Sequence, residues 1–177
     1  MNLGPRLEPS EAERPEAGLR IFRADYRDPQ QATDIVTLLD AYARDPMGGG
    51  QPLSEAVRSR LVPEMAARPQ CFTLLGYLDG KAAGLANCVE GFSTFAAKPL
   101  INIHDIAVLP AFRGRGLAQA LLAEIEAVAR RAGCCKLTLE VLGGNAPAKS
   151  AYRRFGFAEY ELDPTKGHAE FWSKTLA

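Results

Sequence analysis

The chain contains 177 residues, of which 47% are hydrophobic and 24% are charged, and its 21 basic side chains are balanced by 21 acidic ones. This length suits one globular domain, and the composition argues against a disordered or membrane-embedded chain. Because the charges balance, no basic field draws the protein to nucleic acid or to an anionic membrane, and we expect neither partner.

Residues 1–18 contain three prolines, several glutamates and few large apolar side chains. This composition predicts a mobile N-terminal arm, which leaves residues 19–177 as a single domain. No secretory signal pattern and no apolar run of about 18 residues is present, which predicts a cytoplasmic protein. The four cysteines lack zinc-ligand spacing, so we expect reduced thiols and no metal.

The first half of the chain predicts a strand, two helices and the loop between them. Residues 19–24 alternate as a strand, and residues 33–44 place Tyr42 on the apolar face of a helix. The segment DPMGGGQP, residues 45–52, predicts a flexible loop because glycine and proline break helices. Ser54 then caps a second helix that runs to about residue 68, with a break or bend at Pro63.

The second half predicts a hairpin followed by alternating strands and helices. Apolar residues 71–78 and 82–89 flank Asp79-Gly80, a pair that favours tight turns. Further strands are predicted at 100–108, 137–141, 158–162 and 170–175, and helices at 117–132 and 146–155. This order predicts an α/β fold in which a mixed sheet of about seven strands carries helices on both faces.

A glycine-rich turn joins strand 100–108 to the helix that begins at Leu117. Gly114 and Gly116 leave backbone N–H groups uncovered, and the helix N-terminus adds partial positive charge. With Arg113 and Arg115 beside it, the turn predicts a pyrophosphate site. It has neither the Gly-Lys-Ser/Thr ending of a Walker loop nor the GxGxxG of dinucleotide-binding folds. From the glycines alone, a flexible basic connection explains the pattern about equally well.

Two motifs resemble signatures of the GNAT superfamily of N-acetyltransferases. Arg113-Gly114-Arg115-Gly116-Leu117-Ala118 matches the (Gln/Arg)-x-x-Gly-x-(Gly/Ala) acetyl-CoA signature. NAPAKSAYRRFGF, from Asn145 to Phe157, resembles the second signature, with a Tyr seven residues after the Asn and a closing Gly-Phe. The resemblance covers residues 19–176. It implies a GNAT-type twisted, mostly antiparallel sheet, acetyl-CoA as co-substrate without a metal, and a chain that can form a homodimer.

The resemblance also implies which residues hold acetyl-CoA. The backbone of Ile106, Ala107 and Val108 would align the pantetheine arm like an added strand, and the amides from Arg113 to Ala118 would hold the pyrophosphate. Asn145 would bind the same arm, whereas Arg154 either reaches a cofactor phosphate or faces solvent.

The implied reaction is direct attack of a primary amine on the thioester, through a tetrahedral intermediate. Tyr152 matches the family position whose phenol protonates the leaving thiolate. His104 is the favoured base, because some family members carry a histidine there and imidazole titrates in a useful range. Asp105 is the reserve: it is the base, binds a cationic substrate or fixes a loop. Alternation along a strand lets only one of the two face the substrate, and a water chain instead of either remains an alternative.

Substrate choice is expected to come from the segment between the first two helices and from the loop at residues 90–99. GFSTFAAKP in that loop resembles polyamine and thialysine acetyltransferases, and its Phe92 and Phe95 either contact the amine or cover a core or dimer interface. A small primary amine is the leading substrate. A peptide N-terminal amine and a non-catalytic acetyl-CoA sensor are the alternatives.

Overall fold

The computed structural model describes residues 18–160, 163, 165, 167 and 169–176. Within them, five strands form one sheet in the order β1-β2-β3-β4-β5. The first four strands are antiparallel and β5 is parallel to β4. The strands are β1 (Leu19–Arg23), β2 (Cys71–Leu78), β3 (Lys81–Ser93), β4 (Lys98–Val108) and β5 (Leu137–Leu139).

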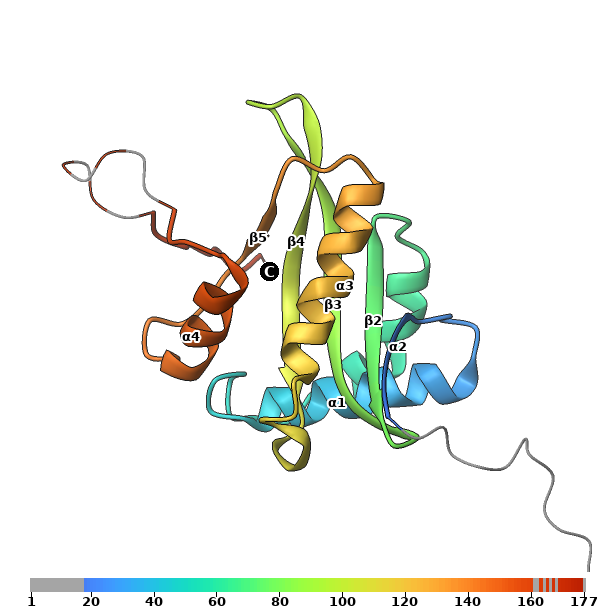
Figure 1. Cartoon of the computed structure of the whole chain (residues 1–177). Helices are drawn as coiled ribbons and strands as arrows, with labels where there is room; N and C mark the ends of the chain where they lie inside the picture. The colour runs from blue at the N-terminus through green and yellow to red at the C-terminus, as the bar shows by residue number, and fades with distance from the viewer. Residues whose placement is uncertain (1–17, 161–162, 164, 166, 168, 177) are drawn as a thin grey trace, which may run out of the picture.

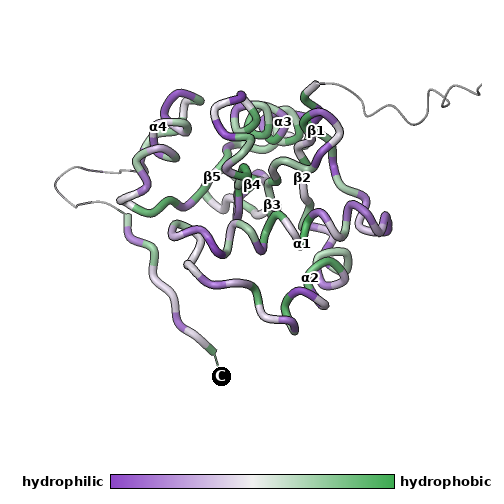
Figure 2. The backbone as a smooth tube through the Cα atoms, turned by 90° about the horizontal axis from the view of Figure 1, so that it is seen from below, coloured by the Kyte–Doolittle hydropathy of each residue, from purple (hydrophilic) through white to green (hydrophobic). Residues whose placement is uncertain are grey.

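In the described residues, four α-helices cover the two faces of this sheet, which gives three layers. They are α1 (Pro29–Arg44), α2 (Glu55–Ala66), α3 (Leu117–Arg131) and α4 (Ala146–Phe155). Figure 1 shows α3 lying across the front of the sheet, and Figure 2 shows α3 and α4 on one side with α1 and α2 on the other. The predicted α/β fold class, with helices on both faces, is confirmed.

Each face of the sheet has its own apolar core. Under α3, the buried side chains include Leu117, Leu121 and Ile125 of the helix, packed on Ile101 and Ile103 of β4. Under α1 and α2, a second core joins α1 and α2 to β2 and β3; its buried members are Ile35, Leu38, Val62, Leu75 and Leu85. Burial of these side chains is the main source of stability for both layers.

Local side-chain chemistry explains where the first two helices begin. The Asp28 carboxylate accepts hydrogen bonds from the amides of Gln30 and Gln31, so α1 starts at Pro29, before the predicted residue 33. Ser54 caps α2 as predicted. Helix α2 continues through Pro63 and ends at Ala66, so the predicted break does not occur.

Two predicted segments differ from the structure. Residues 90–99 were expected to be a loop beside the cleft, but β3 runs to Ser93 and β4 begins at Lys98. This hairpin projects at the end of the sheet opposite the β4–α3 turn (Figure 1). Its Phe92 and Phe95 are exposed. They do not cover the core of the described chain.

The two C-terminal strands predicted at 158–162 and 170–175 are not formed by the described residues of those segments. Strand β5 pairs over only three positions, and no further strand is paired beyond it in the described residues. Tyr160, Phe171 and Trp172 are exposed. Alternating apolar residues predict a strand correctly only where a neighbouring strand supplies hydrogen bonds.

Strand β4 contains an irregularity that shapes the site. Asn87 of β3 pairs with Asp105, whereas the next residue, Cys88, pairs with Ile103. His104 is therefore an extra residue in β4, which is the geometry of a β-bulge. Strand β5 pairs with β4 only as far as Ile103 and then diverges from it.

Candidate active site

The turn between β4 and α3 exposes a row of backbone amides. Gly114 and Gly116 adopt φ angles of 75° and 83°, which L side chains rarely adopt. No side chain caps α3, and the amides from Gly114 to Gln119 have no hydrogen-bond acceptor among the described residues. A Cβ at either glycine would meet nothing within 4 Å, so the space over the turn is open. These free donors at a helix N-terminus fit a pyrophosphate.

Leu117 anchors the turn to the sheet. Its side chain is 1% exposed, and it packs against Gly76 of β2 and Gly84 of β3. A Cβ built on Gly84 would lie 2.9 Å from Leu117 Cδ2 and 2.7 Å from the Ala107 carbonyl oxygen. The glycines therefore permit a close approach that fixes the amides relative to β4.

Both arginines of the turn point to carboxylates of the protein. Arg113 donates to Asp45 at 2.9 Å and to the Val108 carbonyl at 3.0 Å, and Arg115 donates to Asp79 at 3.2 Å. The backbone amides of the turn, and not its guanidinium groups, are therefore the donors left without a partner in the described residues, and the Arg113–Asp45 ion pair ties the turn to the loop after α1.

Strand β4 offers an open backbone edge next to this turn. On one side, Ile106, Ala107 and Val108 pair with Ala86, Leu85 and Gly84 of β3. On the other side, strand pairing with β5 ends at Ile103, so the described residues supply no strand partner beyond the bulge. An extended amide-bearing chain can pair with this edge.

Tyr152 on α4 lies beside the turn. Gln119 of α3 donates a hydrogen bond of 3.1 Å to the carbonyl of Ala151, which holds α4 against the start of α3. The Tyr152 ring packs in the α3-side core and against Phe157, with ring centroids 6.0 Å apart. Burial, and secondarily the nearby Tyr42 phenol, raises the pKa of Tyr152 to about 12, so its O–H remains a proton donor at neutral pH.

Tyr42 of α1 is an electrostatic neighbour of both Tyr152 and Asp105 of β4. Burial raises the pKa of Tyr42, and the negative charges of Asp105 and Asp45 raise it further. The three groups Tyr152, Tyr42 and Asp105, from α4, α1 and β4, are therefore electrostatic neighbours. The sequence placed Tyr42 only on an apolar helix face, and no local motif distinguishes it from a core residue.

The two candidate bases stand in different surroundings. His104 is exposed and makes no hydrogen bond to the described side chains. The Asp105 carboxylate accepts a hydrogen bond of 3.0 Å from the Asn87 amide. The expectation that the two must point to opposite faces assumes a regular strand, and the bulge at His104 removes that regularity.

Asn145 and Arg154 have intramolecular partners here. The Asn145 side-chain oxygen caps α4 by accepting from the Ala148 amide at 3.2 Å, and the Arg154 guanidinium donates to the Ser150 hydroxyl at 3.0 Å. The capping oxygen of Asn145 is occupied, so its amide N–H groups are the ones free to bind a ligand.

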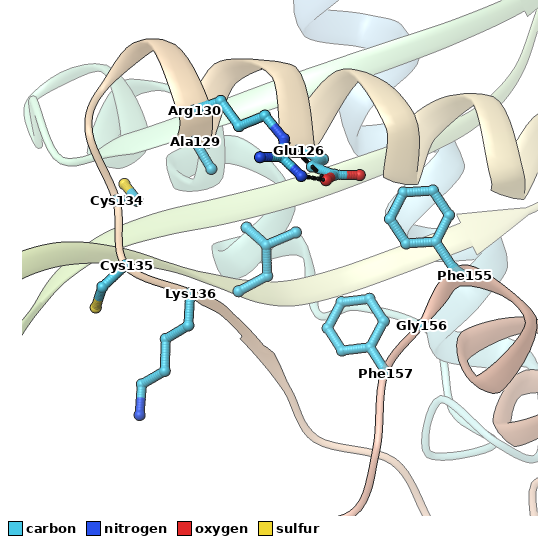
Figure 3. A pocket seen from close by; sticks show the side chains of 10 residues that line it. Glu126, Ala129, Arg130, Cys134, Cys135, Lys136, Phe155, Gly156 and Phe157 are labelled. Carbon is cyan, nitrogen blue, oxygen red and sulfur yellow. Dashed lines mark hydrogen bonds and ion pairs between the residues drawn. The ribbon is translucent and has the colours of Figure 1, made fainter.

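One pocket of the described residues lies away from the glycine turn. Figure 3 shows a pocket of about 280 Å³ between the C-terminal end of α3, β5 and Phe157. Arg130, Cys134 and Cys135 line it, at the far end of α3 from the glycine turn. The fully buried Cys88 has its pKa raised to about 12 by burial and then by Asp105, which makes it a weak nucleophile.

The described residues contain no group of three or more His, Cys, Asp or Glu side chains arranged to hold a metal ion. None of their helices is long and apolar enough to cross a membrane.

Residues 33–157 match the model of the acetyltransferase (GNAT) family. The matched residues include the glycine turn, the open edge of β4 and Tyr152. The chain belongs to the acetyltransferase (GNAT) family.

Curated relatives include a streptothricin acetyltransferase and a thialysine acetyltransferase. Streptothricin acetyltransferase of Streptomyces lavendulae is 42% identical over 85 residues, which cover 48% of this chain and 43% of that protein. Thialysine N-epsilon-acetyltransferase of Sus scrofa is 27% identical over 140 residues, covering 78% of this chain and 75% of that protein. The match thus spans less than half of the streptothricin enzyme.

Solved structures share the fold. AAC(6')-Iy in complex with the bisubstrate analogue CoA-S-monomethyl-acetylneamine superposes with a TM-score of 0.69 at 20% identity, covering 90% of this chain and 100% of that one. At this identity the likeness shows the fold alone.

Proposed function

We propose that the protein transfers the acetyl group of acetyl-CoA to a primary amine of a small molecule. The observation that carries this proposal is the row of unpaired amides from Gly114 to Gln119, which continues the open edge of β4 toward Tyr152. This arrangement suits a pyrophosphate, an extended pantetheine arm and a thioester in that order.

The chain supplies three functions for such a reaction. The turn amides and the β4 backbone from Ile106 to Val108 bind and align the co-substrate. A base, His104 or Asp105, takes a proton from the acceptor ammonium, and the freed lone pair attacks the thioester carbonyl to give a tetrahedral intermediate. Collapse breaks the C–S bond, Tyr152 protonates the departing sulfur, and the second nitrogen proton passes to the Tyr152 phenolate as the amide forms. The net reaction converts an ammonium and a thioester to an amide, a thiol and one proton.

The proposed acceptor is a cationic small molecule. Relatives named for streptothricin, thialysine and aminoglycoside acetylation favour this class. In this chain, Asn102 of β4 contacts Glu140 after β5, on the face of the sheet opposite the buried Ile101 and Ile103. A carboxylate on that face suits an acceptor that carries more than one amine.

The test is acetyl-CoA-dependent thiol release with streptothricin, thialysine, an aminoglycoside, spermidine and a short peptide as separate acceptors. Release that depends on one of the small amines supports the proposal. Turnover of the peptide alone would indicate a peptide N-acetyltransferase. Acetyl-CoA binding by calorimetry without turnover of any acceptor would indicate a sensor.

A further inference from the structure

A row of polar side chains crosses the interior of the sheet and ends at Asp105. Thr73 of β2 pairs directly with Asn87 of β3, and Asn87 pairs directly with Asp105 of β4. Thr73 is 0% exposed and Asn87 is 5% exposed. Their neighbours in these strands are almost entirely apolar, so a row of three polar residues here needs an explanation beyond packing.

Hydrogen bonds connect the row without a gap. Asn87 donates to Asp105 Oδ2 at 3.0 Å, Thr73 donates to Asn87 Oδ1 at 2.7 Å, and the Tyr26 hydroxyl lies 3.1 Å from Thr73 Oγ1. Because the Thr73 hydrogen is used toward Asn87, Tyr26 is the donor to Thr73. Burial raises the pKa of Tyr26, which keeps this phenol protonated.

The hydrogen bonds of this row all run in one direction. Each donor points toward Asp105, so the dipoles of three hydrogen bonds reinforce one another at the carboxylate. The opposite orientation of the Asn87 amide would place its oxygen against the Asp105 carboxylate, where neither group has a hydrogen to donate. The arrangement therefore fixes one oxygen of the Asp105 carboxylate, Oδ2, toward β3.

Other titratable groups lie near Asp105. The Tyr42 phenol approaches from α1, His104 precedes it on β4, and Cys88 lies on the neighbouring strand β3. Tyr152 on α4 is in turn an electrostatic neighbour of Tyr42. Asp105 Oδ1 accepts no hydrogen bond from the described residues, and Tyr42 is an electrostatic neighbour of both Asp105 and Tyr152, the proposed general acid.

We propose that Asp105 is the residue that binds the acceptor ammonium and removes its proton, and that Asn87, Thr73 and Tyr26 are positioning residues for it. This assignment rests on the proposed acetyltransferase function and selects Asp105 over His104. One N–H bond of the ammonium breaks, one O–H bond forms on Asp105, and the amine lone pair attacks the thioester carbonyl.

The test uses isosteric changes along the row, in the full chain, with the best acceptor from the amine panel. Thr73→Val removes the donor to Asn87 and keeps the side-chain shape, and Asn87→Leu removes the donor to Asp105. We expect Thr73→Val to lower kcat/KM for the amine about tenfold and Asn87→Leu to lower it further. In both variants the acidic limb of the kcat/KM profile should move to higher pH, while the affinity for acetyl-CoA stays unchanged. Thr73→Ser restores the hydroxyl and should restore the profile.

Loss of stability alone is separated by a matched control. Ile35→Val removes one buried methylene from the α1-side core and should lower Tm without moving the acidic limb. If Thr73→Val and Asn87→Leu lower Tm but leave the amine KM and the pH profile as in the wild type, the row is structural and the assignment is wrong. The assignment is also wrong if His104→Ala removes the acidic limb and Asp105→Asn does not. Absence of amine turnover in the wild type would instead overturn the proposed function itself.

Discussion

Tyr152 is held in place by contacts that do not involve its hydroxyl. The ring packs on Phe157 and in the α3-side core, and the Tyr152 carbonyl accepts a hydrogen bond from the Phe157 amide at 3.0 Å. Removing the hydroxyl therefore leaves the ring and α4 in place. Tyr152 can be tested chemically with little structural disturbance.

We predict that Tyr152→Phe lowers kcat about 100-fold or more, because an unassisted thiolate is a poorer leaving group than a thiol. The calorimetric Kd for acetyl-CoA should change less than about twofold, because the turn amides and β4 are untouched. Tyr160→Phe, at an exposed position, should behave like the wild type. Equal kcat in Tyr152→Phe and the wild type would remove Tyr152 from the mechanism.

At the scale of elements, the close contact of β3, β4 and α3 positions the cofactor turn. Gly84 is the point of closest approach, because a Cβ there would lie 2.7 Å from the backbone oxygen of Ala107. The Ala107 carbonyl oxygen is a backbone atom, so it cannot rotate away from an added Cβ as a flexible side chain could. An added methyl group must therefore displace β4 or the start of α3.

We predict that Gly84→Ala raises the Kd for acetyl-CoA about tenfold and destabilises the fold by about 1–3 kcal/mol. Gly91→Ala is the matched control on the same strand, because its added Cβ would meet only the end of the Leu100 side chain, at 3.3 Å. Calorimetry and thermal denaturation measure both quantities. Unchanged affinity in Gly84→Ala would show that the turn does not depend on this contact.

The sequence predicted an element correctly where a periodic apolar pattern or a turn residue lies within that element. Helix α4 has the predicted bounds, and the Asp79-Gly80 turn joins β2 and β3. Gly114 and Gly116 mark the turn because their φ angles demand glycine. In contrast, no residue of Ile103-His104-Asp105-Ile106 marks a bulge, which arises from the register between two strands.

The residues around Asp105 were missed for the same reason. Thr73, Asn87 and Tyr26 lie far from Asp105 in sequence and meet only because β2, β3 and β4 pair in one register. A lone Asn in an apolar strand was the available signal, since a buried amide requires partners. The residues proposed to bind the cofactor follow local motifs, whereas those proposed on the acceptor side depend on tertiary pairing.

At the scale of the whole molecule, buried acids make stability depend on pH in the alkaline range. Cys88 is 0% exposed, and its pKa rises from 9.0 to about 12 through burial and then through Asp105. Between these values the unfolded chain has lost the Cys88 proton while the folded chain keeps it. The unfolded state then binds fewer protons, so the free energy of unfolding falls as pH rises from 9 toward 12.

We predict that Cys88→Ala flattens this alkaline loss of stability. A fully buried thiol contributes a slope of at most about 1.4 kcal/mol per pH unit, so the wild type should lose up to about 3 kcal/mol more than Cys88→Ala between pH 9 and 11. Urea unfolding at several pH values measures the difference, and the constant cost of the lost sulfur cancels in the slope. Cys135→Ala removes an exposed thiol and should keep the wild-type dependence. Parallel curves for the wild type and Cys88→Ala would mean that Cys88 titrates alike in the folded and unfolded chains.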